Sequence, residues 1–171
     1  MKKSASGFTI VELLIVIVVI AILAAITIVA YNGIQNNAKN TKTIAATNAW
    51  IKGIRLYEAK TGALPSYNSC FGTSSTYSGN GQCWNGSTWV VNNSFLTAMS
   101  EYMGSFPEPD TTQMDPANYP DRRGSFYQIS GGSSFVWMSL IGVSTCPGLG
   151  GVTFSSQGTG SNGIYCRYIF Q

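Results

Sequence analysis

The feature that most constrains this chain is an apolar stretch near its N-terminus. The 18 residues Leu13–Ala30 are interrupted only by Thr27 and carry no charge. As a helix, a stretch of this length covers about 27 Å, close to the hydrocarbon thickness of a bilayer. Lys2 and Lys3 precede it, and no further basic residue occurs before Lys39, which favours an N-terminus held in the cytoplasm. The sequence therefore predicts a helix that can span a membrane.

Two ordinary interpretations of this stretch leave part of it unexplained. A cleavable secretory signal also has a basic start, but its apolar core spans only about 7 to 15 residues and ends in a small-x-small site. A plain signal anchor accounts for the length and the orientation. Neither explains Glu12, because a carboxylate that enters hydrocarbon is costly unless it is paired.

A third interpretation rests on the string GFTIVELL, which comes after the short basic leader. Gly7 precedes the expected cut, Phe8 follows it, and Glu12 is the fifth residue after it. This string resembles the processing site of type IV prepilins. The resemblance implies that a prepilin peptidase cleaves between Gly7 and Phe8 on the cytoplasmic side. It also implies that the peptidase methylates the new amine of Phe8 and leaves the apolar helix on the mature protein.

The same resemblance implies a role for Glu12 in assembly. Cleavage creates a cation at Phe8, and opposite charges attract far more strongly in a low-dielectric setting than in water. By the resemblance, Glu12 meets the Phe8 amine of a neighbouring subunit and sets the axial register of a filament. The alternative is a carboxylate that stays among the lipid headgroups.

The residues after the apolar stretch continue the helix. No proline occurs between Tyr31 and Lys60, and apolar residues recur at spacings of three, four and seven, which indicates one buried face. The members of this face are Ile44, Trp50, Ile51, Ile54 and Tyr57. The more solvated positions hold Lys39, Lys42, Lys52 and Lys60. We therefore expect one helix from about Phe8 to Lys60.

The end of this helix is marked by Gly62 and Pro65. Glycine can adopt the left-handed conformation after the last turn, and proline prevents continuation. Tyr57, Gly62 and Pro65 also resemble a short motif that comes after the helix in many pilins and pseudopilins. Many pilins carry a proline in the membrane half of the helix; this chain has none there, so we expect no sharp kink.

Beyond Pro65 the local patterns predict a short helix and three strands. The helix begins at a cap on Asn93 or Ser94 and runs through Met103 to a stop at Gly104, and a proline-rich loop comes next. SFYQIS and SFVWMSLI, separated by two glycines, predict a β-hairpin. IYCRYIF predicts a third strand. One face of that strand carries Ile164, Cys166, Tyr168 and Phe170, which an antiparallel sheet laid over the helix would bury.

The chain has four cysteines, at spacings of 13, 63 and 20, and no histidine. These spacings fit no common zinc module, so we expect disulfides and an oxidising compartment outside the cytoplasm. Of three possible connectivities we favour Cys70 with Cys83 and Cys146 with Cys166, because each pair closes a short loop. The second loop resembles the disulfide-bounded C-terminal region of type IV pilins in position.

Several weaker signals point to ordinary surface structure. The glycines GxGxxG at 158–163 lack the strand and helix that would flank a dinucleotide site. Four carboxylates in one loop fit no EF-hand and have arginines beside them, so a solvated loop is favoured; they are Glu108, Asp110, Asp115 and Asp121. Asn85 and Asn92 begin NxS sequons, which are frequent by chance.

The composition excludes several classes of function. Only 10% of the residues are charged, and without Lys2 and Lys3 the chain has eight basic and seven acidic residues. Nucleic-acid binding requires a stronger basic footprint. Without histidine or a thiol expected to be free, no nucleophile with a base is visible. We expect no enzyme activity, no cofactor and no metal.

The local patterns predict an α+β protein, and the resemblance implies the type IV pilin fold: one long N-terminal helix packed against an antiparallel sheet, with a disulfide-bounded C-terminal loop. Residues 1–7 are the leader, 8–30 the membrane and polymerisation half of the helix, 31–62 its amphipathic half, and 63–171 a globular head.

The function predicted from the resemblance is that of a structural subunit of a type IV pilus, serving adhesion, motility or DNA uptake. The expected partners are further copies in a helical filament, prepilin peptidase, and the assembly platform with its ATPase. We expect residence in the cytoplasmic membrane before assembly and in an extracellular pilus afterwards. A pseudopilin of a type II secretion or competence machine and a monomeric membrane-anchored adhesin are the alternatives.

Overall fold

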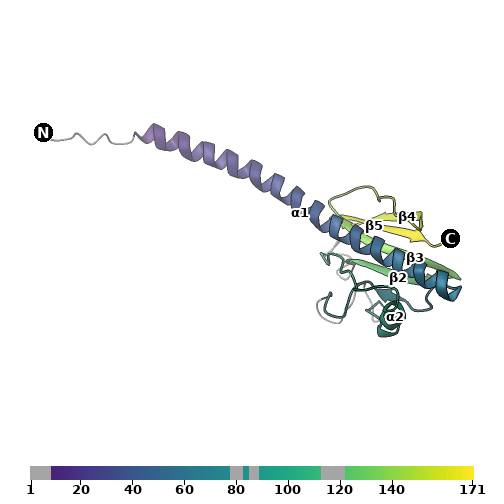
Figure 1. The fold of residues 1–171 in the computed structure, drawn as a ribbon. Coiled ribbons are helices and arrows are strands. Elements are labelled where there is room, and N and C mark those ends of the chain that lie inside the picture. The colour runs from purple at the N-terminus through teal and green to yellow at the C-terminus, as the bar shows by residue number, and fades with distance from the viewer. Residues whose placement is uncertain (1–8, 78–82, 85–88, 113–121) are drawn as a thin grey trace. The chain divides into compact units, whose positions relative to one another are not determined.

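The structure is a computed structural model, and it describes residues 9–77, 83–84, 89–112 and 122–171 of the chain. The described part of the chain begins with a long helix, which is followed by a short helix and five strands (Figure 1). In chain order they are α1 (Ile10–Thr61), β1 (Ser69–Cys70), α2 (Asn93–Met99), β2 (Ser125–Ser130), β3 (Ser133–Ile141), β4 (Thr153–Thr159) and β5 (Gly163–Ile169).

The chain divides into two compact units, residues 1–35 and residues 36–171. α1 contributes to both. Its residues 10–35 form the described part of the first unit, and its residues 36–61 are the helix on which the second unit is built.

The long helix and its end confirm the prediction from the sequence. α1 is assigned as one helix of 52 residues and ends at Thr61. Gly62 comes next with a φ of 78°, and the Gly62 N–H donates to the carbonyl of Glu58 at 2.8 Å. Glycine is suited to this position because it adopts a positive φ at no steric cost.

The buried face of α1 in the second unit is also as predicted. Trp50, Ile51 and Ile54 are buried, and Ile44 and Tyr57 pack at the margins of the core. Trp50 stacks on Phe71 with ring centroids 4.9 Å apart, and its indole N–H donates to a backbone carbonyl at 2.8 Å. The hydrogen bond satisfies the one polar group of this buried ring.

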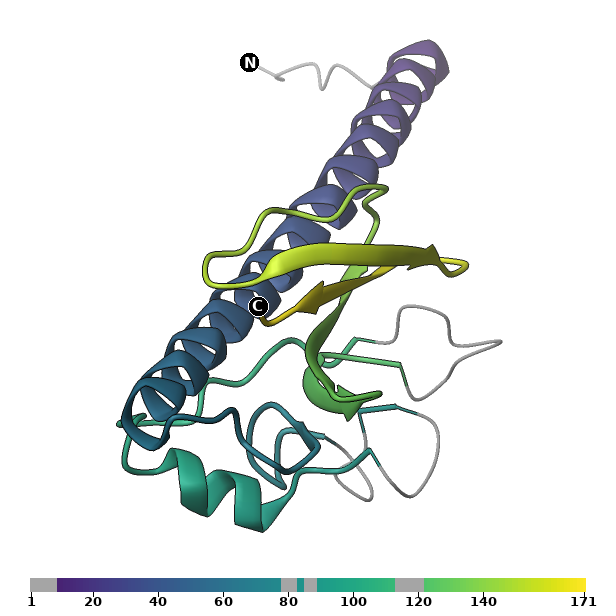
Figure 2. The same ribbon diagram turned by 90° about the vertical axis from the view of Figure 1, so that its right-hand side faces the viewer.

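The strands form a single antiparallel sheet in the order β1-β2-β3-β5-β4, packed against the second-unit part of α1 (Figure 2). The predicted hairpin is confirmed as β2 and β3. Its turn contains Gly131 and Gly132, with φ of 59° and 77°. Tight hairpin turns with two positive φ angles match the twist of the flanking strands, which explains the glycine pair.

The predicted third strand is confirmed as β5. Its residues Ile164, Cys166 and Tyr168 are buried on the α1 side of the sheet, and Phe170 is buried just beyond the strand.

The segment before β5 differs from the prediction, because it contains a strand and not only a loop. β4 pairs with β5 in an antiparallel ladder and carries mostly exposed, small polar residues. Such residues show no strand pattern of their own, so the backbone pairing with β5 holds β4 in place. The GxGxxG glycines therefore do have a strand beside them, but they lead into β5 and not into the helix of a dinucleotide site.

The bounds predicted for the short helix were wrong at both ends. The cap is Asn92, whose Oδ1 accepts from the N–H groups of Ser94 and Phe95 at 2.9 and 3.3 Å. The helix ends at Met99, and the next N–H, that of Ser100, donates to the Thr97 carbonyl three residues back at 3.3 Å. Tyr102 and Met103 lie in the turns beyond the helix.

Candidate functional site

At the N-terminus of α1, the side chains of Thr9 and Glu12 each accept a hydrogen bond from the backbone N–H of the other residue. The Glu12 carboxylate accepts from the Thr9 N–H at 2.8 Å and lies 2.7 Å from the Thr9 hydroxyl oxygen. In return the Thr9 hydroxyl accepts from the Glu12 N–H at 3.2 Å. This is the reciprocal arrangement of a capping box, in which two free N–H groups at a helix start are satisfied together.

The capping box orients the residue to which the sequence assigned a role in assembly. Gly7 and Phe8, the predicted cleavage and methylation residues, lie outside the described residues. Thr9, to which the Glu12 carboxylate is bonded, is the next residue in sequence after Phe8. The sequence reasoning missed Thr9, although Thr-x-x-Glu before an apolar run is a recognisable capping signal.

The described part of the first unit presents a mostly apolar, exposed helix surface. From Ile10 to Ile28 all side chains are exposed, and the one hydroxyl within the apolar stretch, that of Thr27, donates to the Ala24 carbonyl at 2.9 Å. α1 is long and apolar enough to cross a membrane. A helix that is apolar all round is stable only when lipid or other protein covers it.

The structure places the four cysteines in two disulfides, the same two pairs that the sequence favoured. Cys70 bonds Cys83 and Cys146 bonds Cys166, with Cα–Cα distances of 5.8 and 5.7 Å. All four thiols of the chain are thereby paired. Cys70 and Cys83 are fully buried, whereas Cys146 is half-buried.

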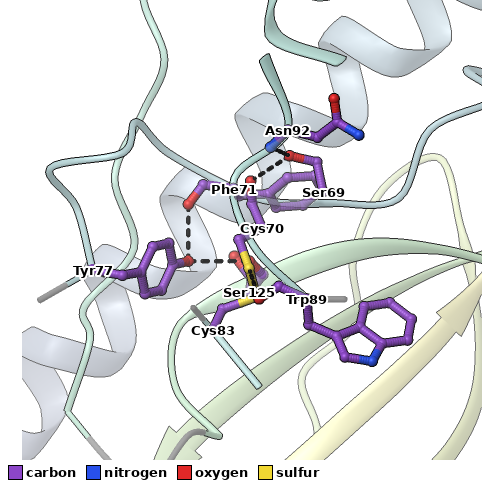
Figure 3. The surroundings of a disulfide bond; sticks show 8 residues. All are labelled: Ser69, Cys70, Phe71, Tyr77, Cys83, Trp89, Asn92 and Ser125. Atoms are coloured by element: carbon purple, nitrogen blue, oxygen red, sulfur yellow. Dashed lines mark hydrogen bonds between the residues drawn. A yellow bond between two sulfur atoms is a disulfide. The ribbon is translucent and has the colours of Figure 1, made fainter. Parts of the chain in front are cut away.

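A buried tyrosine fastens the loop of the first disulfide to the sheet (Figure 3). The Tyr77 hydroxyl lies 2.9 Å from the Phe71 carbonyl oxygen and 3.2 Å from that of Ser125. Burial raises the pKa of Tyr77 well above its usual range. Gly124 leaves room for this ring, since a Cβ at that position would come within 2.6 Å of the hydroxyl. The tyrosine therefore links β1, the disulfide and β2.

In the loop that holds the four carboxylates, Glu108 is bonded to two threonine hydroxyls of its own chain. The Glu108 carboxylate accepts from the hydroxyls of Thr76 and Thr73 at 2.7 and 3.0 Å, and these bonds lower the pKa of Glu108. Asp115 and Asp121 lie outside the described residues. Within the described ranges no group of three or more potential metal ligands occurs.

The comparisons with known proteins concern the N-terminus. A family model of the prokaryotic N-terminal methylation motif matches residues 2–28. Neither the curated proteins nor the solved structures provide a match. The matched range contains Gly7, Phe8, Thr9 and Glu12, together with most of the apolar stretch.

The motif implies processing by a prepilin peptidase, and the apolar helix with this signal fits membrane anchoring before assembly. The long helix, the antiparallel sheet and the C-terminal disulfide are consistent with the type IV pilin fold. The chain therefore carries, on that fold, the class III signal of type IV pilin-like proteins.

Proposed function

We propose that this protein is a structural subunit of a type IV pilus, assembled through its apolar helix into an extracellular filament. The observation that carries the proposal is the coincidence of the methylation motif with an exposed apolar helix that remains after the predicted cut. Removal of residues 1–7 would leave all of α1 on the mature chain. Among the described residues of the first unit nothing covers the apolar side chains of that helix, so copies of it supply the covering in a filament.

The proposed role is structural and not catalytic. The filament needs a subunit with a helix for the core and a stable exposed domain. The two disulfides, one fully buried and one bounding the β4 region, suit an exposed domain in an oxidising environment. The expected partners are further copies, prepilin peptidase and the assembly platform with its ATPase.

The test combines mass spectrometry with electron microscopy of the native protein. Filaments sheared from cells should contain peptides of this chain, and the mature N-terminus should be Phe8 with a methylated amine. Protein confined to the cell envelope, with the same processed N-terminus, would instead favour a pseudopilin. A mature start near Tyr31 would identify an ordinary signal peptide and overturn the proposal.

A further inference from the structure

Arg167, in the middle of β5, carries a cation on the sheet face that points away from α1. Its neighbours Cys166 and Tyr168 are buried on the α1 side, so Arg167 projects from the opposite face. The guanidinium carbon lies 3.7 Å from the ring centroid of Phe135 and 5.3 Å from that of Trp137. Stacking on the two rings holds the guanidinium in one place.

No carboxylate in the described part of the chain pairs with this guanidinium. Its Nε is buried and has no hydrogen-bond partner there. Arg55 shows the contrast, since it is bonded to Glu58 at 2.7 Å and to the Gly151 carbonyl at 2.9 Å. A guanidinium offers a rigid fork of donors that suits an oxyanion, and a buried donor without a partner is costly. The buried Nε is out of reach of another molecule, but Arg167 as a whole is only half-buried, so the other guanidinium N–H groups are the donors left to receive a carboxylate from outside its own chain.

Glu101 is the matching group on the same molecule. It lies in the turn after α2 and is exposed. The other carboxylates that the structure describes each accept a hydrogen bond from their own chain: Glu12 from Thr9, Glu58 from Arg55, Glu108 from Thr76 and Asp110 from Thr112. Among the described carboxylates, Glu101 alone has no such donor.

These two groups lie on separate parts of the second unit. α2 and β5 are apart in both views, and α2 does not belong to the sheet (Figures 1 and 2). A contact between two different surfaces of identical copies is heterologous, and repetition of such a contact generates an open helical array. A filament is an array of this kind.

We propose that the guanidinium of Arg167 binds the Glu101 carboxylate of a second copy of this chain. The proposal rests on the proposed function, because it assigns a contact between neighbouring subunits of the filament. Exposed lysines on α1, such as Lys52 and Lys60, are weaker candidates. A mobile, solvated lysine contributes little to an ion pair, whereas Arg167 is already held and partly desolvated.

Charge exchange tests the pair in cells that make only the variant subunit. Arg167→Glu places two carboxylates together and Glu101→Arg places two guanidinium groups together, so each should lower the yield of sheared filaments by at least about tenfold. The double variant restores opposite charges and should recover filaments. Lys60→Glu, an equal change of charge at an exposed position, is the matched control and should assemble normally.

The outcomes separate the pair from a general folding effect. Arg167→Glu also removes the contact of the guanidinium with its two rings, and Glu101→Arg cannot repair that damage. Recovery of filaments in the double variant therefore requires contact between the two positions. Arg167→Met keeps a long side chain over Phe135 without the charge, and it should still lower filament yield. Normal filament yield in Arg167→Met, or a double variant no better than Arg167→Glu, would overturn the pair. Wild-type filaments would still support the proposed function in that case.

Discussion

Asn40, on α1, bonds both backbone groups of Ile141 at the end of β3. Its amide nitrogen donates to the Ile141 carbonyl at 2.8 Å, and its Oδ1 accepts from the Ile141 N–H at 2.9 Å. The two residues are 101 positions apart, and Asn40 is buried. The side chain thus takes the place of a neighbouring strand at a point where the ladder ends.

Substitution of Asn40 should therefore destabilise the second unit. Asn40→Ala leaves a buried donor and a buried acceptor of Ile141 without partners, and we expect a loss of about 2 to 4 kcal/mol in the free energy of unfolding. Denaturant unfolding monitored by tryptophan fluorescence measures it. Asn37→Ala, at an exposed position three residues earlier, is the control. Equal stability of the two variants would show that the Asn40 bonds are of no consequence.

Glu12 is the residue at which the capping box and the assembly prediction meet. If its carboxylate pairs with the Phe8 amine of a neighbouring copy, Glu12→Ala removes the partner of that amine, and filament assembly should fail. Cleavage after Gly7 should persist, because the peptidase acts before assembly. Disulfides of the second unit should form normally.

One strain that carries Glu12→Ala allows all three properties to be measured: precursor processing, disulfide content and surface filaments. Thr9→Val provides a comparison, since it removes the hydroxyl of the capping box and keeps the carboxylate. Abundant filaments from Glu12→Ala would favour the plain membrane anchor over the assembly role.

Buried tyrosines make the second unit sensitive to alkali. Burial raises the pKa of Tyr127 to about 12, and it also raises the pKa values of Tyr77 and Tyr168. A tyrosine in the unfolded chain has a pKa of about 10, so these phenols hold their protons more tightly in the folded state than in the unfolded state. Stability from this source is complete below about pH 10 and is lost as the pH rises through 10 toward 12 and above.

Thermal unfolding at a series of alkaline pH values checks this direction. Tyr127→Phe should cost about 1 kcal/mol at neutral pH, because it removes hydrogen bonds to Pro65 and Ser134. It should then lose less stability than the wild type above about pH 10. Tyr67→Phe, at an exposed position, should match the wild-type curve. A wild-type unfolding midpoint that stays constant to about pH 12 would contradict the linkage.

The two disulfides should differ in their response to reductant. Cys70 and Cys83 are both buried, whereas Cys146 is half-buried, so Cys146–Cys166 should be reduced first in the folded protein. Replacement of that pair by alanines should lower the free energy of unfolding by about 3 kcal/mol, because the cross-link restricts the unfolded chain. Alkylation of new thiols and subsequent peptide mapping show the order. Free thiols in exported protein would contradict the assignment to an oxidising compartment.

Much of the fold could be predicted from local spacing alone. The apolar stretch, the buried stripe at Trp50 and Ile54, and Gly62 together predicted α1 and its end, because helix periodicity and capping involve residues within a few positions of each other. The glycine pair at Gly131 and Gly132 predicted the hairpin for the same reason. Glu12 was recognised as unusual because its charge stands alone before a long apolar run.

The tertiary structure decided the contacts between residues far apart in the chain. β4 is a strand because β5 offers it a ladder, and its own small polar residues give no period from which a strand can be inferred. The bonds of Asn40 to Ile141, and the carbonyls that meet at Tyr77, depend on how the sheet packs on α1 and on the disulfide loop. From the sequence alone, polar side chains of this kind are expected at the surface. Only the packing of distant segments shows that they are buried and bonded, because burial is a property of the assembled chain and not of the neighbours in sequence.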